Sequence, residues 1–498
     1  MMNKGFLPTG SILAGMLTSH ILAFLNVYLS NIDLHRKLTA LETAGYFLVP
    51  NRFTMYMLGE FRSAFFGGLF FTLTIGAALT IITLAAIWAW INLFRKNRFV
   101  LIPFFILWIG CLVEANSQGF CPMLSSYLMF VPLVVLISAR RWMNSEPKKK
   151  SRLNAAILLA PIILLTILWS TLSDQNLFIN IRDYLLLSNP VGIKINDFYY
   201  KYTLYAAEAF KPLSRKTLKT CSLWNFNEES GLRLLEDKLL NHDYLILSTD
   251  KVDLKIDKQG DELVFRNQGK DIIRTSQRQF LSDPASLLRL FSEQTDNNRF
   301  FRSFTYFSIL IGFPIILYLL THTALQNILG FIKHSTTALT TASMICLLIG
   351  IALFVPVYGS KSGDFKALDI AGAMQSDRWQ DKVAALREIY RKKYEIMDYQ
   401  DYMNIKDSPH IPVRYWLVKA LGVSKRQETY NDLFSFLDDP HPNVVCQALD
   451  AFGQRGDKKA VDVIIQRMGE SRHWYVQSYG YSAMRELGWK QEKSILNN

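Results

Sequence analysis

The chain has 498 residues, of which 50% are hydrophobic and 13% aromatic, and Lys and Arg outnumber Asp and Glu by 55 to 42. The apolar residues occur in long runs, whereas a soluble chain of this length usually divides into several less apolar domains. The composition therefore excludes an ordinary soluble protein and predicts a polytopic α-helical membrane protein. The formal charge of +13 does not predict a nucleic-acid partner, because the basic residues cluster beside the apolar runs, as in cytoplasmic loops. Attraction to an anionic partner or lipid surface is the alternative explanation of this charge.

Seven apolar segments approach the ~20 residues that a helix needs to cross a ~30 Å hydrocarbon core. Residues 1–172 are predicted to form a membrane domain of five spans, at about 6–29, 64–93, 99–115, 122–139 and 153–172. Two further spans are predicted within residues 303–357, at about 303–322 and 337–357. The first span follows Lys4 and has no clear small-x-small cleavage site after it, which favours a signal anchor. Residues 31–62 are polar and aromatic and are predicted to be a loop with an interfacial helix.

The basic residues set the expected orientation. They follow the second span at Arg95, Lys96 and Arg98, and separate the fourth and fifth spans at 140–152. The positive-inside rule places both loops in the cytoplasm. Seven crossings that start inside then make residues 173–302 and the C-terminal domain periplasmic, in a multi-pass protein of the bacterial cytoplasmic (inner) membrane. The loop at Lys333 carries little charge to fix the last two spans.

Residues 173–302 interrupt the apolar pattern for long enough to form a small α+β extracytoplasmic domain. An aromatic helix at 193–210 is expected at the membrane interface, and a second helix at 227–240. Strands are predicted at 244–247, 252–256 and 262–265, with a fourth at 271–275 and a helix at 284–291. Residues 358–376 are predicted to be a linker.

One short pattern occurs three times in residues 377–498, and it predicts a helical solenoid. The copies are His410 to Val413, His441 to Val444 and His473 to Val476, at spacings of 441 − 410 = 31 and 473 − 441 = 32. Each Val is followed seven residues later by an alanine, which places both on one helix face. A fixed period near 30 with helical content is typical of stacked repeats. A degenerate helix at 382–394 is expected to cap the stack.

Turn and cap residues recur with the same period. Gly422 and Gly453 lie where the first helix of each pair is predicted to end. Ser408, Asp439 and Ser471 precede the repeats, where a helix cap is expected.

The segment Asp439-Pro-His-Pro-Asn-Val444 resembles the opening of the short bacterial HEAT-like repeats, a kind also known from phycobilisome lyases. Val413-Arg414 matches the Val-Arg step of that opening, whereas Val445 and Gln477 replace the Arg in the other copies. The resemblance covers the repeats alone and implies an all-α solenoid. It does not fix the function, because such repeats serve scaffolds, adaptors and lyases alike.

Six repeat residues are candidates for binding a partner: His410, Arg414, His441, His473, Trp474 and Tyr475. The histidines would form a titratable edge that recognises an acidic partner, or simply occupy a repeat-start position that tolerates a polar residue. A shared metal is not expected, because neighbouring repeats lie ~8–10 Å apart and zinc needs nitrogens at ~2.0–2.1 Å. The aromatic residues would be a binding hot spot if exposed, or part of the core if buried.

No nucleotide-binding, zinc-protease or hydrolase motif occurs in the sequence, and none of the five cysteines forms a CxxC. We therefore expect no enzyme, no cofactor and no metal site. The favoured function is an anchored scaffold or interaction subunit, which docks proteins of a membrane complex through its repeats and its α+β domain. The alternatives are a membrane subunit of a transport or export complex energised by another protein, and an unrecognised integral membrane enzyme. Convergence of His20, Asn26, Glu114 and His322 in space would favour transport.

Overall fold

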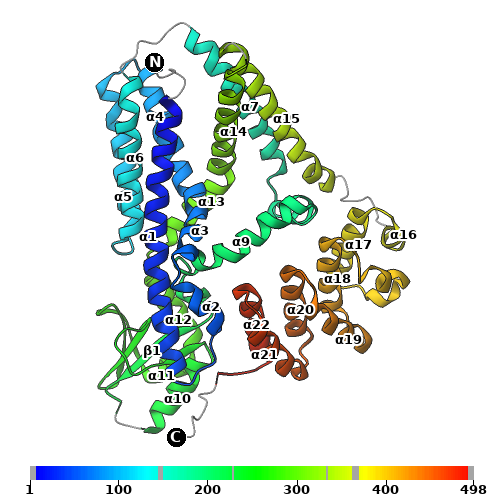
Figure 1. Cartoon of the computed structure of the whole chain (residues 1–498). Helices are drawn as coiled ribbons and strands as arrows, with labels where there is room; N and C mark the ends of the chain where they lie inside the picture. Colours follow the sequence, from blue (N-terminus) through cyan, green and yellow to red (C-terminus); the bar gives the residue numbers. More distant parts are fainter. Residues whose placement is uncertain (1–6, 144–149, 227–228, 333–334, 362–368, 492–498) are drawn as a thin grey trace.

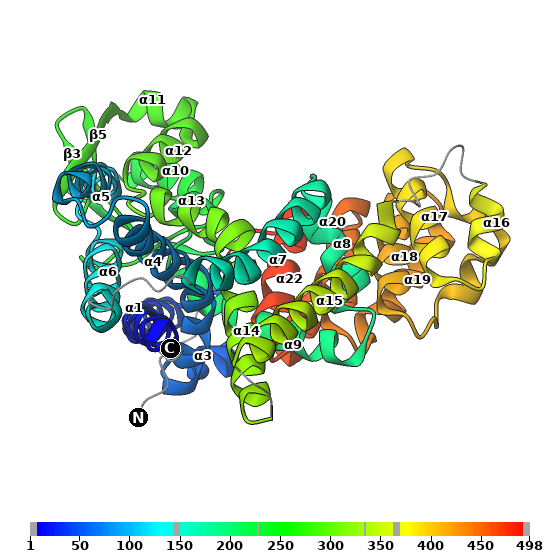
Figure 2. The same cartoon turned by 90° about the horizontal axis from the view of Figure 1, so that it is seen from above.

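The computed structural model describes residues 7–143, 150–226, 229–332, 335–361 and 369–491. Figure 1 shows three parts: a bundle of long helices, a small α+β domain at one end of it, and a stack of short helices beside that same end. Seen from above in Figure 2, the α+β domain and the stack lie on opposite sides of the central helices.

The helix bundle contains the apolar segments of the sequence. Its helices are α1 (Leu7–Thr43), α3 (Phe61–Phe71), α4 (Ala77–Asn92), α5 (Leu101–Ala115), α6 (Pro122–Met143), α7 (Lys150–Leu172), α13 (Arg299–Phe307), α14 (Phe313–Gly330) and α15 (Ser335–Lys361). One π-helical turn, η1 (Thr72–Gly76), joins α3 to α4, and another, η5 (Ser308–Gly312), joins α13 to α14. Six described helices are long and apolar enough to cross a membrane, and a seventh crossing is counted if α7 and the helix after it, bent by 107°, form one span.

Helix α1 extends well beyond the predicted end of the first span near Leu29. It continues to Thr43, so much of the predicted polar loop is helical. No Gly or Pro interrupts this stretch, and Leu34, Leu38 and Leu41 form an apolar stripe that packs in one cluster with Leu245 and Leu247. The chain leaves the helix at Gly45, where φ is +80°. A short helix, α2 (Arg52–Leu58), then follows.

The contact between α1 and α3 depends on small residues. A Cβ added to Gly68 would lie 3.0 Å from the backbone nitrogen of Phe24 and 3.3 Å from the Cβ of Ala23. Close approach of backbones through small residues is how helices associate in lipid. Nearby, Nδ1 of His20 lies 3.0 Å from Oγ1 of Thr72, which pairs a polar side chain of α1 with the π turn.

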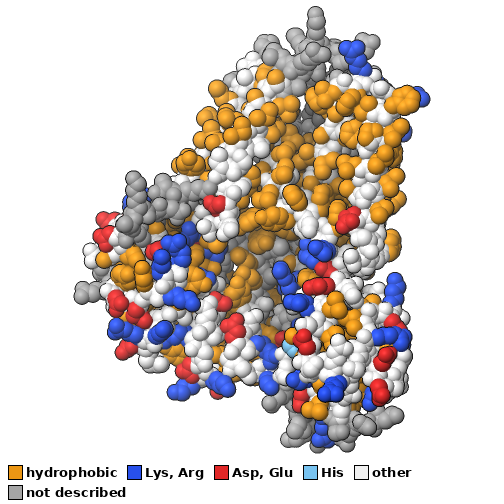
Figure 3. Space-filling model, turned by 180° about the vertical axis from the view of Figure 1, so that it is seen from behind, with side chains coloured by type: hydrophobic (Ala, Val, Ile, Leu, Met, Phe, Trp, Pro, Cys, Tyr) orange, Lys and Arg blue, Asp and Glu red, His pale blue; other side chains and the backbone are white. Residues whose placement is uncertain are grey.

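The bundle surface changes character along its length. In Figure 3, hydrophobic side chains cover the end that carries the N-terminus, and charged side chains cover the end that carries the α+β domain and the stack. Such a boundary is expected where apolar helices leave a membrane and water-exposed domains begin.

The α+β domain holds a five-stranded sheet in the order β2-β1-β3-β4-β5. Its strands are β1 (Lys219–Trp224), β2 (Tyr244–Ile246), β3 (Leu254–Gln259), β4 (Glu262–Asn267) and β5 (Lys270–Ser276), and its helices are α10 (Glu229–Leu240), α11 (Gln277–Ser282) and α12 (Pro284–Gln294). Strand β1 pairs in parallel with β2 and β3, and β3 to β5 form an antiparallel meander. Four strands lie where the sequence predicted them, and the predicted start of α10 at Asn227 lies outside the described residues. The central strand β1 was not predicted.

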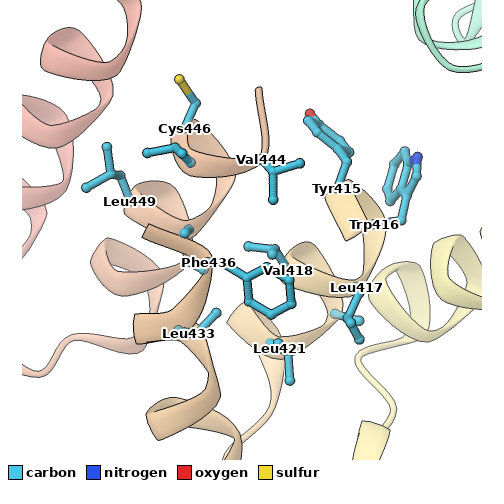
Figure 4. Packing of buried hydrophobic residues seen from close by; sticks show 14 of the residues in the cluster. Tyr415, Trp416, Leu417, Val418, Leu421, Leu433, Phe436, Val444, Cys446 and Leu449 are labelled. Carbon is cyan, nitrogen blue, oxygen red and sulfur yellow. The ribbon is translucent and has the colours of Figure 1, made fainter. Parts of the chain in front are cut away.

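The stack is built of helix pairs. Its helices are α16 (Ile370–Gln375), α17 (Trp379–Lys392), α18 (Ile411–Val423), α19 (Gln427–Ser435), α20 (Pro442–Arg455), α21 (Val461–Glu470) and α22 (Trp474–Glu486). Figure 4 shows part of the stack's core, where Val418 and Leu421 of α18 and Leu433 and Phe436 at α19 point toward one another within one helix pair. The helix predicted at 382–394 is α17. Of the predicted linker, residues 362–368 lie outside the described residues.

Helices α18 and α20 end one and two residues after Gly422 and Gly453, close to the predicted positions, but neither glycine is the C-cap. Both lie inside helices, and a Cβ on Gly422 would meet the Cβ of Ala451 at 2.9 Å. A Cβ on Gly453 would meet Cα of Ala483 at 3.2 Å. The glycines therefore let each first helix approach the next repeat closely, and the left-handed C-cap of α20 is Gly456.

Candidate functional site

The candidate site is the edge of the stack where its first helices α18, α20 and α22 begin. This edge faces a connector that follows α7, made of α8 (Leu177–Ile181), the π turn η3 (Arg182–Leu186) and α9 (Pro190–Glu208). In Figure 1 the connector lies between the bundle and the stack. The side chains at this edge of the stack therefore lie beside the connector.

Asp183 is the central contact of the connector. Its side chain is fully buried and accepts hydrogen bonds from Nη2 of Arg387 at 2.6 Å and Nε1 of Trp416 at 2.7 Å. Nε of the neighbouring Arg182 donates at 2.7 Å. A buried carboxylate is tolerated only when it is paired and hydrogen-bonded in this way. The connector is therefore joined to α17 and α18 by a buried ionic contact.

The two guanidinium groups at Asp183 have further partners. Nη1 of Arg387 donates to Oδ1 of Asn180 at 2.8 Å, and its Cζ lies 4.9 Å from the Trp416 ring centroid. Cζ of Arg182 lies 3.8 Å above the Tyr415 ring. Arg is suited to this position because its planar group stacks on aromatic rings while it donates hydrogen bonds.

Helix α9 continues the contact along the next two repeats. Nδ2 of Asn196 lies 3.4 Å from Oδ1 of Asn443, and the ring centroids of Tyr200 and Tyr475 are 4.5 Å apart. Nε2 of His441 lies 3.6 Å from Oδ1 of Asp197. The acidic group that this histidine faces thus belongs to the chain itself.

His441 also serves as the N-cap of α20, because its Nδ1 accepts from the backbone N–H of Asn443 at 3.3 Å. Burial lowers the pKa of His441, and the Asp197 carboxylate offsets part of that effect. The pKa of His473 is lowered by burial and opposed by Asp197 in the same way. Both histidines are therefore kept neutral near pH 7.

The predicted cap residues lie two residues before the observed N-caps. His410, His441 and His473 are the N-cap residues. The backbone N–H of each histidine is bound by a side chain two residues earlier, at Ser408, Asp439 and Ser471. Histidine therefore recurs at the N-cap of the first helix of each repeat.

The loop between α1 and α2 docks on the last repeat. Nδ2 of Asn51 donates to the carbonyl oxygens of Met468 at 3.0 Å and Ser471 at 3.0 Å, and its backbone N–H donates to Oε1 of Gln477 at 2.8 Å. Nε2 of Gln477 donates in turn to Oγ1 of Thr54 at 3.0 Å. A loop of the helix bundle therefore occupies this end of the stack.

Gln477 occupies the position in its repeat that Arg414 occupies in the first repeat, and its contacts are partly the same. Both side chains donate to the carbonyl of the residue six positions earlier, Arg414 to Ser408 at 2.6 Å and Gln477 to Ser471 at 2.7 Å. Arg414 also reaches Asp439 in the next repeat at 2.6 Å. Gln477 instead binds the Asn51 loop, so its departure from the repeat pattern marks an internal docking point.

Further contacts tie the stack to the other parts. Trp474 is buried in the cluster that contains Leu38 and Leu245. The hydroxyl of Tyr481 donates to Oδ1 of Asp243 in the α+β domain at 2.6 Å. Three parts of the chain therefore meet at the last repeat.

The six candidate partner-binding residues all make contacts within the chain. The ring of His410 stacks on Trp379 with centroids 5.5 Å apart, and Arg414 bridges two repeats. His441, Trp474 and Tyr475 contact the connector or the bundle, and His473 lies at the same edge. The structure brings His441 and His473 to one carboxylate, while His410 lies apart beside Trp379.

Asp183, Asn51 and Arg387 were not among the residues predicted from the sequence to be functional. The sequence did contain one signal for Asp183. Arg182 and Asp183 are the only charged residues in the otherwise uncharged run 177–187, and a carboxylate in such surroundings needs a charged or hydrogen-bonding partner. Within the described part of the chain, no hydrogen bond or ion pair joins any two of His20, Asn26, Glu114 and His322. His322 pairs with Ser343 at 3.0 Å, and Asn26 donates to its own helix at Leu22.

The geometry defines a class of protein: a stack of helix pairs held against a bundle of long apolar helices. Residues 403–485 match the family model of HEAT repeats, so the C-terminal stack is a HEAT-repeat segment, in agreement with the predicted resemblance. No curated protein and no solved structure matches the chain.

Proposed function

We propose that this chain is a bacterial inner-membrane protein that acts as an anchored scaffold, docking proteins of a membrane complex through its HEAT repeats and its α+β domain. One observation carries the proposal: the repeats are fastened to the apolar bundle by the buried Asp183 contact. HEAT repeats generally mediate protein–protein contacts, and a stack fixed in this way would present a constant surface at the membrane.

The expected topology follows from the two ends of the bundle. Arg95, Lys96, Arg98 and Arg140 lie at the end that carries the N-terminus, and the repeats and the α+β domain lie at the other end. The positive-inside rule favours the first end as cytoplasmic and the second as periplasmic. Modification of Lys393→Cys, but not Arg98→Cys, by a membrane-impermeant maleimide in intact cells would support this arrangement, and the reverse result would refute it.

Site-specific photo-cross-linking in native membranes tests the scaffold function. Tyr394 and Met403 are exposed on the repeats, at 45% and 48%, and Phe99 is a control at the opposite end of the bundle. We expect discrete protein adducts from the two repeat positions. Adducts from bundle positions only would contradict the scaffold function and favour the transport alternative.

A further inference from the structure

An open groove crosses the edge of the repeats opposite to the connector. It has a volume of about 850 Å³ and lies where α17, α18 and α20 end. Its lining residues are Tyr390, Arg391, Lys393, Gly422, Val423, Ser424, Lys425, Gln427, Tyr430, Gln454, Arg455 and Asp457. The groove thus spans three successive helix layers.

The groove is basic. Four of its lining residues are cations and one, Asp457, is an anion. Arg391 is paired with Glu388 at 2.6 Å outside the lining. Lys393 and Lys425 are exposed, and among the described residues neither has an ion-pair partner. These two lysines provide the unneutralised charge.

The nearby carboxylate of Glu395 forms no ion pair with either lysine side chain among the described residues. Its oxygens accept from the hydroxyl of Ser424 at 2.5 Å and from the backbone N–H of Lys425 at 3.1 Å. Arg455 is oriented by the carbonyl oxygens of Leu421 at 3.1 Å and Arg426 at 2.6 Å. The guanidinium group of Arg455 and the backbone of Lys425 are therefore held in place.

One lining residue of the groove, Tyr430, carries an unsatisfied polar group. Tyr430 is 4% exposed, and its hydroxyl has no hydrogen-bond partner among the described residues. A buried hydroxyl without a partner is unfavourable, so a ligand that supplied an acceptor would be favoured. This observation is independent of the lysines.

The location disfavours a lipid surface as the ligand. Helices α18 and α20 have 13 and 14 residues and rise ~1.5 Å per residue, so their ends lie roughly 20 Å from their starts. The starts face the connector beside the bundle, and the ends point away from it. The chain cannot readily supply the ligand either, because each segment outside the described ranges contains at most one Asp or Glu.

We propose that this groove binds an extended acidic segment of a partner protein, with its carboxylates on Lys393 and Lys425 and an acceptor on Tyr430. Complementary charge speeds association and selects the partner. The inference rests on the proposed scaffold function, because it names the chemistry of the docked partner.

The test measures binding of a fluorescent acidic peptide to the full chain in mild detergent, by anisotropy at low salt. The probe is a twelve-residue peptide of alternating Glu and Gly, and an equivalent peptide of Gln and Gly is the neutral control. We expect only the acidic peptide to bind, and Lys393→Glu/Lys425→Glu to weaken it about tenfold or more. The neutral pair Lys393→Gln/Lys425→Gln should weaken it less, and Tyr430→Phe should weaken it without changing the salt dependence.

A matched control removes equal charge elsewhere on the repeats. Lys459 and Lys490 are exposed and do not line the groove, so Lys459→Glu/Lys490→Glu should leave binding within about twofold. Equal weakening by both pairs, or no binding of the acidic peptide, would overturn the inference. Binding of phosphatidylglycerol vesicles, but not the peptide, through Lys393 and Lys425 would overturn it in favour of a lipid.

Cross-linking separates the two proposals. If Tyr394 and Met403 still give protein adducts when Lys393→Glu/Lys425→Glu is present, the scaffold function holds and the groove inference fails. If no adducts form with the unmodified chain, the scaffold function itself fails.

Discussion

Substitution of Asp183 by Asn should loosen the repeats from the bundle. The change keeps the size of the side chain and one acceptor oxygen for Nε1 of Trp416. It removes the negative charge that faces Arg182 and Arg387. Because Asp183 is fully buried, water cannot replace the lost charge.

The magnitude follows from the burial. Removal of one partner of a buried ion pair costs about 3–5 kcal/mol, because the other charge stays buried without compensation. Retention of the Trp416 bond places Asp183→Asn at the lower end, about 3 kcal/mol. Since 1.36 kcal/mol corresponds to tenfold, the detached population should rise roughly a hundredfold.

Amide hydrogen exchange of the full chain in detergent measures this change. Helices α17 and α18 should exchange roughly a hundredfold faster in Asp183→Asn, while the sheet should be unchanged. The control is Glu388→Gln on the same helix α17, which breaks a pair whose Arg391 is 71% exposed and should cost less than about 0.5 kcal/mol. Equal exchange in Asp183→Asn and Glu388→Gln would refute the conclusion that Asp183 anchors the repeats.

Three further predictions concern other contacts. Asn51→Ala removes the side-chain hydrogen bonds to Met468, Gly469 and Ser471 and should weaken the docking of this loop on the last repeat by about 2 kcal/mol. A protease added to the detergent-solubilised protein should then cleave faster near α21, and unchanged cleavage would contradict the prediction. The folded-state pKa of His441 lies below its unfolded value near 6.5, so its contribution to stability is complete above that value and is lost as pH falls toward the lowered pKa. Thermal unfolding from pH 7.5 to 5.5 should accordingly show a smaller decrease for His441→Asn than for the unmodified chain, and parallel curves would show that another group titrates. Gly68→Leu should force α1 away from α3 at a cost of about 1–3 kcal/mol, while Gly110→Leu, with no atom within 4 Å of the added Cβ, should leave the melting temperature unchanged.

Regular periodicity made much of the fold predictable. The 31- and 32-residue spacing located the repeats, because each copy must present the same apolar face to its neighbours. The strands β2 to β5 follow from short β-prone runs with a turn at Gly260. Strand β1 was missed because Thr220, Cys221 and Ser222 give no alternating pattern, yet all three are buried at the centre of the sheet.

Predictions failed where tertiary contacts replace a local rule. The polar part of α1 looked like a loop, because its apolar stripe is narrow and packs on the α+β domain, a partner the sequence does not reveal. Gly422 lies one residue before the end of α18, as its position suggested, but its role is close packing on Ala451 and not a C-cap. The candidate histidines were considered as a repeat position, whereas Asp197, the carboxylate that acts on His441 and His473, lies more than 200 residues earlier in the chain.

Helix α9 connects the two halves of the molecule through different faces. The ring of Phe66 in α3 lies 5.5 Å from Phe198 and 5.0 Å from Tyr202, centroid to centroid. Tyr200, two positions from each, faces Tyr475 in the last repeat. Because successive residues turn by about 100° around a helix, positions 198 and 202 share one face and position 200 lies on another. Helix α9 therefore packs against α3 of the bundle and against the last repeat at the same time, so the position of the repeats depends on a helix that is itself packed against the apolar helices.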